Sequence, residues 1–311
     1  MLRAWHRCRA DRGSANSNSR YFSTKYCANV AAISALKPVW VTSMTDRVTA
    51  LTEKLIADGL RRLESTPFEG LAFAGEQEAN ALLNPLGAHP HAFVMGCLVD
   101  RQVPAERAWR LPLAVKTRCR ERTGGSFMIE ELAKFSEDDW LGYLVTPTPA
   151  DAPHTPPSLH RFPSDMARVL YLATQRIVTV YKGDASRIWQ DRPSSARLVR
   201  RFLEFHGAGP KIACMAANIL VRDVRIPVSD YRYIDISADV LVRRVMGRLG
   251  LVEEGARPDV VVYAAREMNP DFPGVFDTIV WEIGRNYCHP REPSCPECPL
   301  HSYCAYASNQ Q

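Results

Sequence analysis

The sequence predicts an all-α fold, and three observations support that prediction. Apolar residues recur at helical spacing through most of the chain from Thr45 onward, and only Arg225–Val228 briefly has a strand pattern. Hydrophobic residues make up 46% and charged residues 23%, which is ordinary for a globular protein and excludes disorder throughout. A chain of 311 residues suggests about two domains, and no apolar run approaches the ~20 residues that a membrane helix needs.

Residues 1–44 differ from the rest in composition. They contain seven Lys or Arg and one acidic residue, Asp11. An Arg-rich, acid-poor N-terminus is typical of a mitochondrial transit peptide. The alternative, which we favour, is a disordered tail or a start codon assigned too early, with Met44 as the true start. We therefore expect a cytoplasmic or nucleoid protein, and a mitochondrial one only if the segment is genuine and the source eukaryotic.

Six helices are predicted in order along the chain, each from an apolar stripe. They cover residues 45–64, 88–98, 105–115, 126–144, 164–181 and 194–205. The Pro-rich segment 146–157 cannot lie inside a helix, so it is predicted to be an inserted surface loop.

The segment Phe205-His-Gly-Ala-Gly-Pro-Lys-Ile-Ala213 joins two of these helical stretches. Gly207 and Gly209 permit a tight turn that another chain can approach closely. Pro210 suits the first turn of a helix, whose free N–H groups form an anion site. The segment therefore fits a hairpin that holds a DNA phosphate, with an ordinary corner between helices as the alternative.

Asp239 opens a further helix whose buried stripe contains Val242, Val245 and Met246. One interpretation is a simple N-cap, because Asp is favoured there. The other is a carboxylate that faces a cleft, where it can stabilise a cationic sugar and help to deprotonate a nucleophile.

The nine cysteines divide into two groups. Five are scattered along the chain, as expected of reduced core thiols. The other four, Cys288, Cys295, Cys298 and Cys304, are separated by six, two and five residues. Four thiolates on one loop can hold zinc or a [4Fe-4S] cluster. Zinc sites usually show two close cysteine pairs and only one is present, so the spacing fits zinc less well but leaves both metal centres open at this point.

Together these motifs resemble the helix-hairpin-helix DNA glycosylase superfamily, and the cysteine spacing is similar to that of the endonuclease III branch. Lys211 matches the position of the family's nucleophile, and Asp239 followed by Arg244-Val245 matches the pattern of its catalytic carboxylate. The chain departs from the family at His206 and Ile212, and an insertion near 223–233 lengthens the stretch between Lys211 and Asp239.

The resemblance implies two helical lobes. One is a six-helix barrel over 88–222, with the helix-hairpin-helix at 194–221. The other is an iron–sulfur cluster domain built from 45–87 and 223–311, with its [4Fe-4S] loop at 288–304. Lys211 and Asp239 would face each other across the cleft between them.

The resemblance also implies DNA-contacting residues. Gln102 would fill the gap left by a flipped base. Gly207, Gly209, Arg285, His289 and Arg291 would contact phosphates. For Arg285, His289 and Arg291 the alternative is a solvated surface charge. The net charge of +5, from 32 Arg and 7 Lys against 34 acidic residues, fits a polyanionic partner without requiring one.

The function implied is that of a DNA base-excision repair glycosylase and AP lyase, working as a monomer on double-stranded DNA with a damaged base. The family's commonest substrate is an oxidised pyrimidine. Two alternatives stay open: a monofunctional glycosylase for alkylated, deaminated or mismatched bases, and a non-catalytic DNA-binding protein with a structural metal site. The adenine-glycosylase branch fits less well because it usually lacks the lysine.

Overall fold

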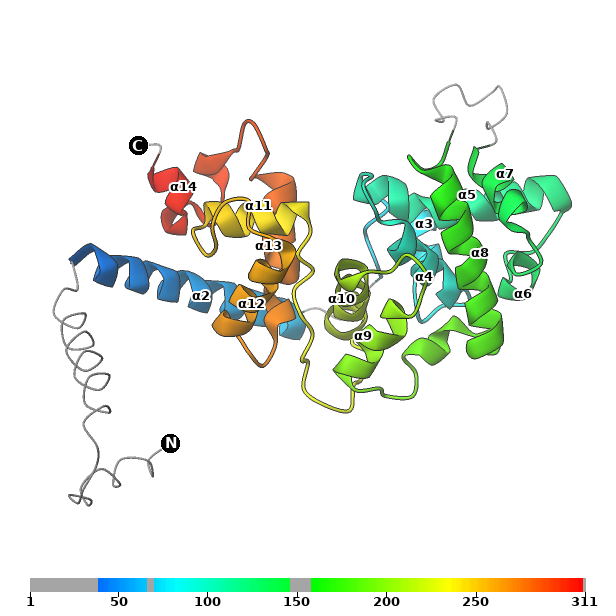
Figure 1. Ribbon diagram of the computed structural model, residues 1–311, viewed down its shortest axis with the longest axis horizontal. Helices are drawn as coiled ribbons and strands as arrows, with labels where there is room; N and C mark the ends of the chain where they lie inside the picture. The colour runs from blue at the N-terminus through cyan, green and yellow to red at the C-terminus, as the bar shows by residue number, and fades with distance from the viewer. Residues whose placement is uncertain (1–38, 66–69, 146–157, 310–311) are drawn as a thin grey trace, which may run out of the picture. The chain divides into compact units, whose positions relative to one another are not determined.

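The computed structural model describes residues 39–65, 70–145 and 158–309. Every regular element in these ranges is a helix and none is a strand, which confirms the all-α prediction (Figure 1). The helices are α2 (Val39–Ser65), α3 (Gln77–Leu82), α4 (Pro90–Val99), α5 (Ala105–Thr123), α6 (Ile129–Leu132), α7 (Glu137–Val145), α8 (Pro163–Val180), α9 (Ser195–Leu203), α10 (Pro210–Asn218), α11 (Val240–Arg248), α12 (Pro258–Met268), α13 (Asp277–Asn286) and α14 (Ala305–Ser308).

Short turns of other helical types connect these elements. They are the 3-10 turns η1 (Ala185–Ile188), η3 (Pro273–Phe276), η4 (Cys295–Glu297) and η5 (His301–Tyr303), and the π-helical turn η2 (Ile219–Asp223), which follows α10 directly. None of the helices in the described ranges combines the length and apolarity that a membrane span needs. Residues 1–38 and the Pro-rich segment 146–157 lie outside the described residues.

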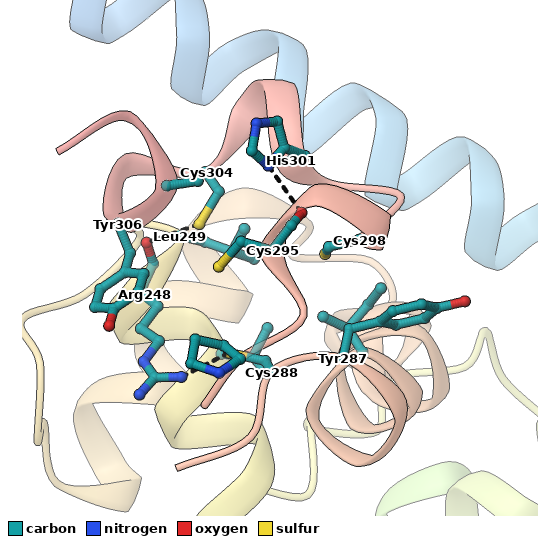
Figure 2. A pocket seen from close by; sticks show the side chains of 13 residues that line it. Arg248, Leu249, Tyr287, Cys288, Cys295, Cys298, His301, Cys304 and Tyr306 are labelled. Carbon is teal, nitrogen blue, oxygen red and sulfur yellow. Dashed lines mark hydrogen bonds between the residues drawn. The ribbon is translucent and has the colours of Figure 1, made fainter. Parts of the chain in front are cut away.

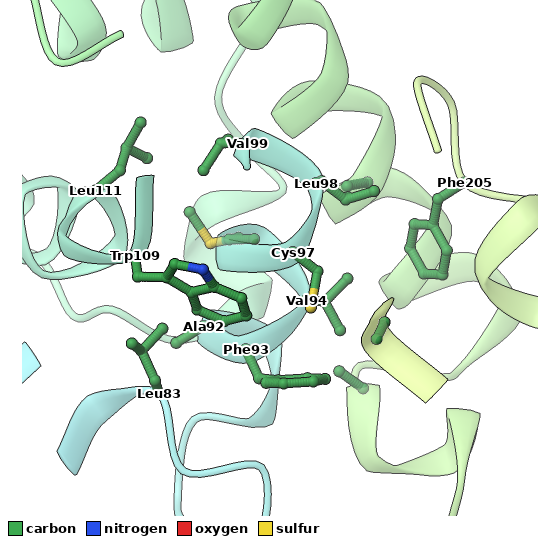
Figure 3. Close-up of a cluster of buried hydrophobic side chains, with 14 of the residues drawn as sticks. Leu83, Ala92, Phe93, Val94, Cys97, Leu98, Val99, Trp109, Leu111 and Phe205 are labelled. Atoms are coloured by element: carbon green, nitrogen blue, oxygen red, sulfur yellow. The ribbon is translucent and has the colours of Figure 1, made fainter. Parts of the chain in front are cut away.

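The chain divides into two units, residues 1–49 and residues 50–311, and the second contains two hydrophobic cores. The first core surrounds α4, whose residues from His91 to Val99 are all buried (Figure 3). Trp109 of α5 packs so closely on this helix that a Cβ at Gly96 would lie 2.7 Å from its ring. The core draws on residues from Leu71 to Ile234, so it begins before residue 88 and continues past residue 222.

The second core joins the N-terminal helix to the C-terminal part of the chain. Leu51 and Leu55 of α2 are fully buried among apolar residues of α11, α12 and α13. The helical stripe of Val242, Val245 and Met246 lies in this core, as the sequence predicts. Segments from both ends of the chain thus form one core, in agreement with the two-lobed all-α fold.

Several element boundaries differ from the prediction. The helix expected over 126–144 is two helices, α6 and α7, because Ser136 and Asp139 exchange hydrogen bonds and cap α7. Helix α2 begins at Val39, so the expected boundary after residue 44 lies inside it. The strand pattern at Arg225–Val228 was misleading, since that segment has no β partner among the described residues.

Candidate active site and cysteine loop

Side chains from both cores line one cavity of about 290 Å³. Its walls combine aromatic rings with carboxylates, which include Phe73, Trp109, Trp281, Asp100, Asp223, Asp239, Asp277 and Glu282. Two arginines, Arg62 and Arg222, also line it and pair with Glu282 and Asp223. Aromatic faces beside placed polar groups are typical of a site that binds a planar polar ligand.

Asp239 lies at this cavity as the N-cap of α11. Its Oδ1 accepts a hydrogen bond of 2.8 Å from the Val242 N–H. Burial raises the pKa of the carboxyl above its ordinary value, while the Val242 N–H and the charge of Lys211 act in the opposite direction. The N-cap interpretation of Asp239 is confirmed, and the cap also fixes its carboxylate at a cavity, while its catalytic role stays a prediction.

Lys211 lies in the first turn of α10 and forms an ion pair. Its Nζ is 3.0 Å from Oδ2 of Asp100 and 3.3 Å from the Asp100 carbonyl oxygen. The Lys211 charge lowers the pKa of Asp239, so the structure brings the two predicted residues into one electrostatic neighbourhood. Asp100, which follows the last residue of α4, was not singled out from the sequence.

Asp277 and Arg222 also belong to this site and were not anticipated. Asp277 is buried at the start of α13, and Arg222 is buried in the π-helical turn η2. No motif marks either residue. The only sequence signal is a charged residue inside an otherwise apolar stretch.

Asp235, a second carboxylate four residues before Asp239 in the chain, has a different partner. Its two oxygens accept hydrogen bonds of 2.6 and 2.7 Å from Arg266 of α12. It does not line the cavity that Asp239 lines.

The hairpin between α9 and α10 has the geometry that its glycines allow. Gly207 has a φ of +82°, and a Cβ there would lie 2.8 Å from both Arg101 and Val169. Its carbonyl oxygen accepts a hydrogen bond of 3.0 Å from Nη1 of Arg101. Gly209 is the N-cap of α10, and a Cβ built there meets nothing within 4 Å. The hairpin is thus exposed and tied to the link between α4 and α5.

The residues predicted to contact DNA differ in their exposure and in whether they already have partners within the protein. Gln102 is exposed in the link between α4 and α5, with an unusual φ of +54°. Arg291 is exposed and His289 half-buried in the loop after α13. Arg285, however, pairs with Glu106 and stacks on the Trp281 ring, so its guanidinium already has partners within the protein.

The four clustered cysteines line a second, small cavity (Figure 2). Its wall also includes apolar Val245, Leu249 and Ile283 together with Arg248 and His301. All four cysteines are half-buried free thiols. Burial, together with the neighbouring thiols, raises the pKa of Cys295 and Cys298.

Two arginines of α11 bind the cysteine loop. Arg248 donates a hydrogen bond of 3.3 Å to Sγ of Cys288, and others to the carbonyl oxygens of His289 and Pro290. Arg244 donates to the carbonyl oxygens of Cys288 and Gly284. Within the part of the chain that the structure describes, no group of three or more His, Cys, Asp or Glu side chains is arranged to hold a metal ion.

Comparison with solved structures identifies the architecture. An endonuclease III trapped as a covalent intermediate with DNA, in an estranged-adenine complex, is 14% identical with a TM-score of 0.53, and the match covers 84% of this chain and 98% of that chain. A non-covalent endonuclease III–DNA complex is also 14% identical, with a TM-score of 0.52 and coverage of 84% and 97%. The chain has the helix-hairpin-helix glycosylase fold. A thermostable thymine-DNA glycosylase shares it, at 11% identity, a TM-score of 0.51 and coverage of 85% and 98%.

The helix-hairpin-helix glycosylase fold accounts for the arrangement described above. The sequence resemblance is thereby confirmed at the level of the fold. No protein-family model matches the chain, and no curated protein matches it in sequence.

Proposed function

We propose that this protein is a DNA glycosylase that removes a damaged base from double-stranded DNA. The observation that carries the proposal is the cavity at which Asp239 lies beside the Lys211–Asp100 ion pair. The shared fold supports it, because the three similar structures are glycosylases or their complexes with DNA. The N-glycosidic bond is shielded in a stacked duplex, so the nucleotide must leave the helix to reach such a cavity.

Asp239 is the carboxylate that stabilises the transition state. Breaking the bond between C1′ and the base leaves positive charge on the sugar, and a fixed carboxylate at that place lowers the barrier. The Val242 N–H holds the Asp239 side chain in position. We expect Asp239→Asn to lower the rate of base release by about 10²–10³-fold with little change in DNA affinity.

Lys211 is the nucleophile in the leading form of the proposal. Its neutral amine attacks C1′ and loses a proton, and the base departs with the bonding electron pair and gains a proton. The C1′–O4′ bond of the sugar ring then opens, O4′ is protonated, and a Schiff base is left at C1′. Loss of a proton from C2′ then breaks the C3′–O bond and nicks the strand. Borohydride reduction traps the Schiff base, so a covalent protein–DNA adduct that disappears in Lys211→Ala supports this form.

A monofunctional glycosylase is the second candidate, and the ion pair between Lys211 and Asp100 favours it. The 3.0 Å contact gives the Lys211 Nζ a carboxylate partner within the protein, which suits an ion-pairing role rather than that of a nucleophile. Under this form, wild-type protein releases the base without leaving an adduct. Asp100→Asn separates the candidates further, because removing the counter-charge increases trapping only if Lys211 is the nucleophile.

The DNA-binding surface comprises the hairpin at Gly207 and Gly209, the exposed Gln102, and the loop with His289 and Arg291. Gln102 and the hairpin lie together because Arg101, next to Gln102, donates to the Gly207 carbonyl oxygen. We propose that the protein binds DNA here as a monomer, with Gln102 entering the gap left by the base. An oxidised pyrimidine is the first lesion to test.

The cysteine loop is proposed to hold a [4Fe-4S] cluster through Cys288, Cys295, Cys298 and Cys304. The four thiols share one cavity with apolar walls and one arginine hydrogen-bonded to sulfur, which suits a four-thiolate cluster. The cluster would supply structural order to the loop, and zinc is the alternative occupant. Equal iron and sulfide content in purified protein supports the cluster, whereas one zinc per chain contradicts it.

A further inference from the structure

A buried carboxylate on α13 connects the two proposed catalytic residues through one serine. Asp277 is the first residue of α13, and its Oδ1 accepts a hydrogen bond of 2.9 Å from the Ser237 N–H. Both residues are buried, with exposed fractions of 7% for Asp277 and 5% for Ser237. Because a buried hydrogen bond to a charged group is strong, this contact fixes the Ser237 backbone.

Ser237 in turn contacts the backbone of both proposed catalytic residues. Its hydroxyl donates to the Lys211 carbonyl oxygen at 3.2 Å. Its carbonyl oxygen accepts a hydrogen bond of 2.7 Å from the Asp239 N–H. Any displacement of Ser237 therefore moves the start of α10 and the N-cap of α11 relative to each other.

The other oxygen of Asp277 faces Arg222. Oδ2 of Asp277 lies 3.6 Å from Nη1 of Arg222, and that nitrogen is buried without a hydrogen-bond partner. The remaining guanidinium nitrogens bind Asp223 at 2.8 Å. Arg222, in the π-helical turn η2 that follows α10, therefore places a positive charge beside the second oxygen of Asp277.

We propose that Asp277 is a positioning residue for the glycosylase reaction: its ionised carboxylate, held between Arg222 and the Ser237 N–H, sets the placement of Asp239 relative to Lys211. The proposal rests on the proposed function, because it assigns those two residues their chemical roles. It adds a residue at the start of α13 that belongs to none of the motifs identified in the sequence.

Charged groups from each neighbouring element set the titration of Asp277. Burial, together with the charges of Asp239 and Asp223, raises its pKa to about 6 against the opposing effects of Arg222 and the Ser237 N–H. Arg62 of α2 and Glu282 of α13 line the same cavity as a pair. Asp277 is therefore ionised above about pH 6 and protonated below it, and positioning through its charge fades on acidification.

The test compares Asp277→Ala and Asp277→Asn with wild type in single-turnover base release. We expect Asp277→Ala to lower the rate about 10²-fold and to leave DNA affinity within about twofold, since a small misplacement of reacting groups slows chemistry more than binding. Asp277→Asn keeps an oxygen for the Ser237 N–H, so its loss is smaller. Its rate should also lose the part of the decline below about pH 6 that we expect Asp277 to cause in wild type.

Asp230→Asn is the matched control. The Asp230 carboxylate also accepts a hydrogen bond from a buried backbone N–H, the Ser195 N–H at 2.8 Å. Unlike Asp277, Asp230 does not line the cavity. We expect this control to keep the wild-type rate and pH profile. The positioning role is overturned if the acid decline persists unchanged in Asp277→Asn, or if Asp277→Ala lowers DNA affinity as much as it lowers the rate.

A second readout separates this inference from the proposed function. Hydrogen exchange of the Ser237 amide in full-length protein needs no substrate. We expect protection in wild type and Asp277→Asn and faster exchange in Asp277→Ala, whether or not any lesion is excised. A wild-type protein that excises nothing contradicts the glycosylase proposal, whereas unchanged Ser237 exchange in Asp277→Ala contradicts the positioning contact.

Discussion

Half-buried Asp239 and buried Asp277 are two carboxylates whose surroundings give them different properties. Asp239 is bound by one N–H of its own helix and influenced by Lys211. Asp277 is more deeply buried, and its pKa lies near 6 even though Arg222 is beside it. Neighbouring carboxylates with separate environments are a common feature of sites that perform acid and base chemistry.

The burial of Asp277 leads to a prediction about stability. Its pKa of about 6 in the folded state exceeds the ~3.9 of an unfolded Asp, so the fold binds this proton more tightly. The stabilisation from the proton is full below about pH 4 and is lost as the pH rises through about 6. Asp277→Asn, which stays neutral, should therefore raise the free energy of unfolding at pH 7.5 by about 1–3 kcal/mol and change it little at pH 4.

Urea unfolding of wild type and Asp277→Asn at both pH values measures this difference. An equal gain in the free energy of unfolding at pH 4 and pH 7.5 would show that the charge of Asp277 does not cause the gain. A gain in stability combined with a slower reaction is the trade-off expected of a functional buried charge.

Sequence motifs identified some site residues and missed others for a physical reason. Lys211 and Asp239 stand in local patterns with helix signals around them, so they could be singled out. Asp100 and Asp277 act through partners 111 and 40 residues away, Lys211 and Ser237. Periodicity and spacing carry no information on contacts at such separations.

The two glycines of the hairpin between α9 and α10 differ in backbone conformation and in the space around them. Gly207 has a positive φ, and a Cβ added there would meet two neighbours at 2.8 Å, whereas Gly209 has an ordinary φ and open space beside it. The first glycine is needed for the fold of the hairpin. The second leaves open space in which a ligand can approach the backbone.

Substitution by alanine should separate these two roles. We expect Gly207→Ala to lower the free energy of unfolding by more than about 1 kcal/mol, because alanine is strained at positive φ. Gly209→Ala should leave stability within about 0.5 kcal/mol but weaken binding to duplex DNA about tenfold, since its Cβ would occupy the space a phosphate needs. Thermal unfolding and fluorescence anisotropy measure the two effects; unchanged DNA affinity in Gly209→Ala would contradict a phosphate site at the hairpin.

Helix boundaries followed local capping chemistry more than apolar periodicity. The Ser136–Asp139 capping box divides the helix expected over 126–144, and Gly124, with a φ of +62°, ends α5 well beyond the expected residue 115. Both signals are present in the sequence. The π-helical turn at Ile219–Asp223, whose Arg222 is buried beside Asp277 of α13, has no such signal in the sequence.

At the scale of the molecule, α2 joins a core with α11, α12 and α13, across most of the chain's length. Amphipathic periodicity predicts that such helices are buried on one face but does not say against which partner. The two-lobed arrangement came from the family resemblance instead. Loop 288–304 then attaches to the second core through Arg244 and Arg248 of α11.

Metal content tests this account of the loop. We expect about four iron and four sulfide per chain in anaerobically purified protein, and loss of both in Cys298→Ser. Removal of the cluster should expose the loop to proteolysis and weaken DNA binding while leaving the first core folded. Cys214→Ser, at a buried thiol of the first core, is the matched control and should retain the iron.

The most direct test of the central claim is base release from a panel of duplexes that each contain one lesion. The account predicts that wild-type protein releases at least one damaged base, that Asp239→Asn slows the release by about 10²-fold or more, and that the variant still binds the same duplex. Wild-type protein that binds DNA but releases no base from any duplex, or full activity in Asp239→Asn, would contradict the assignment of a glycosylase acting through Asp239.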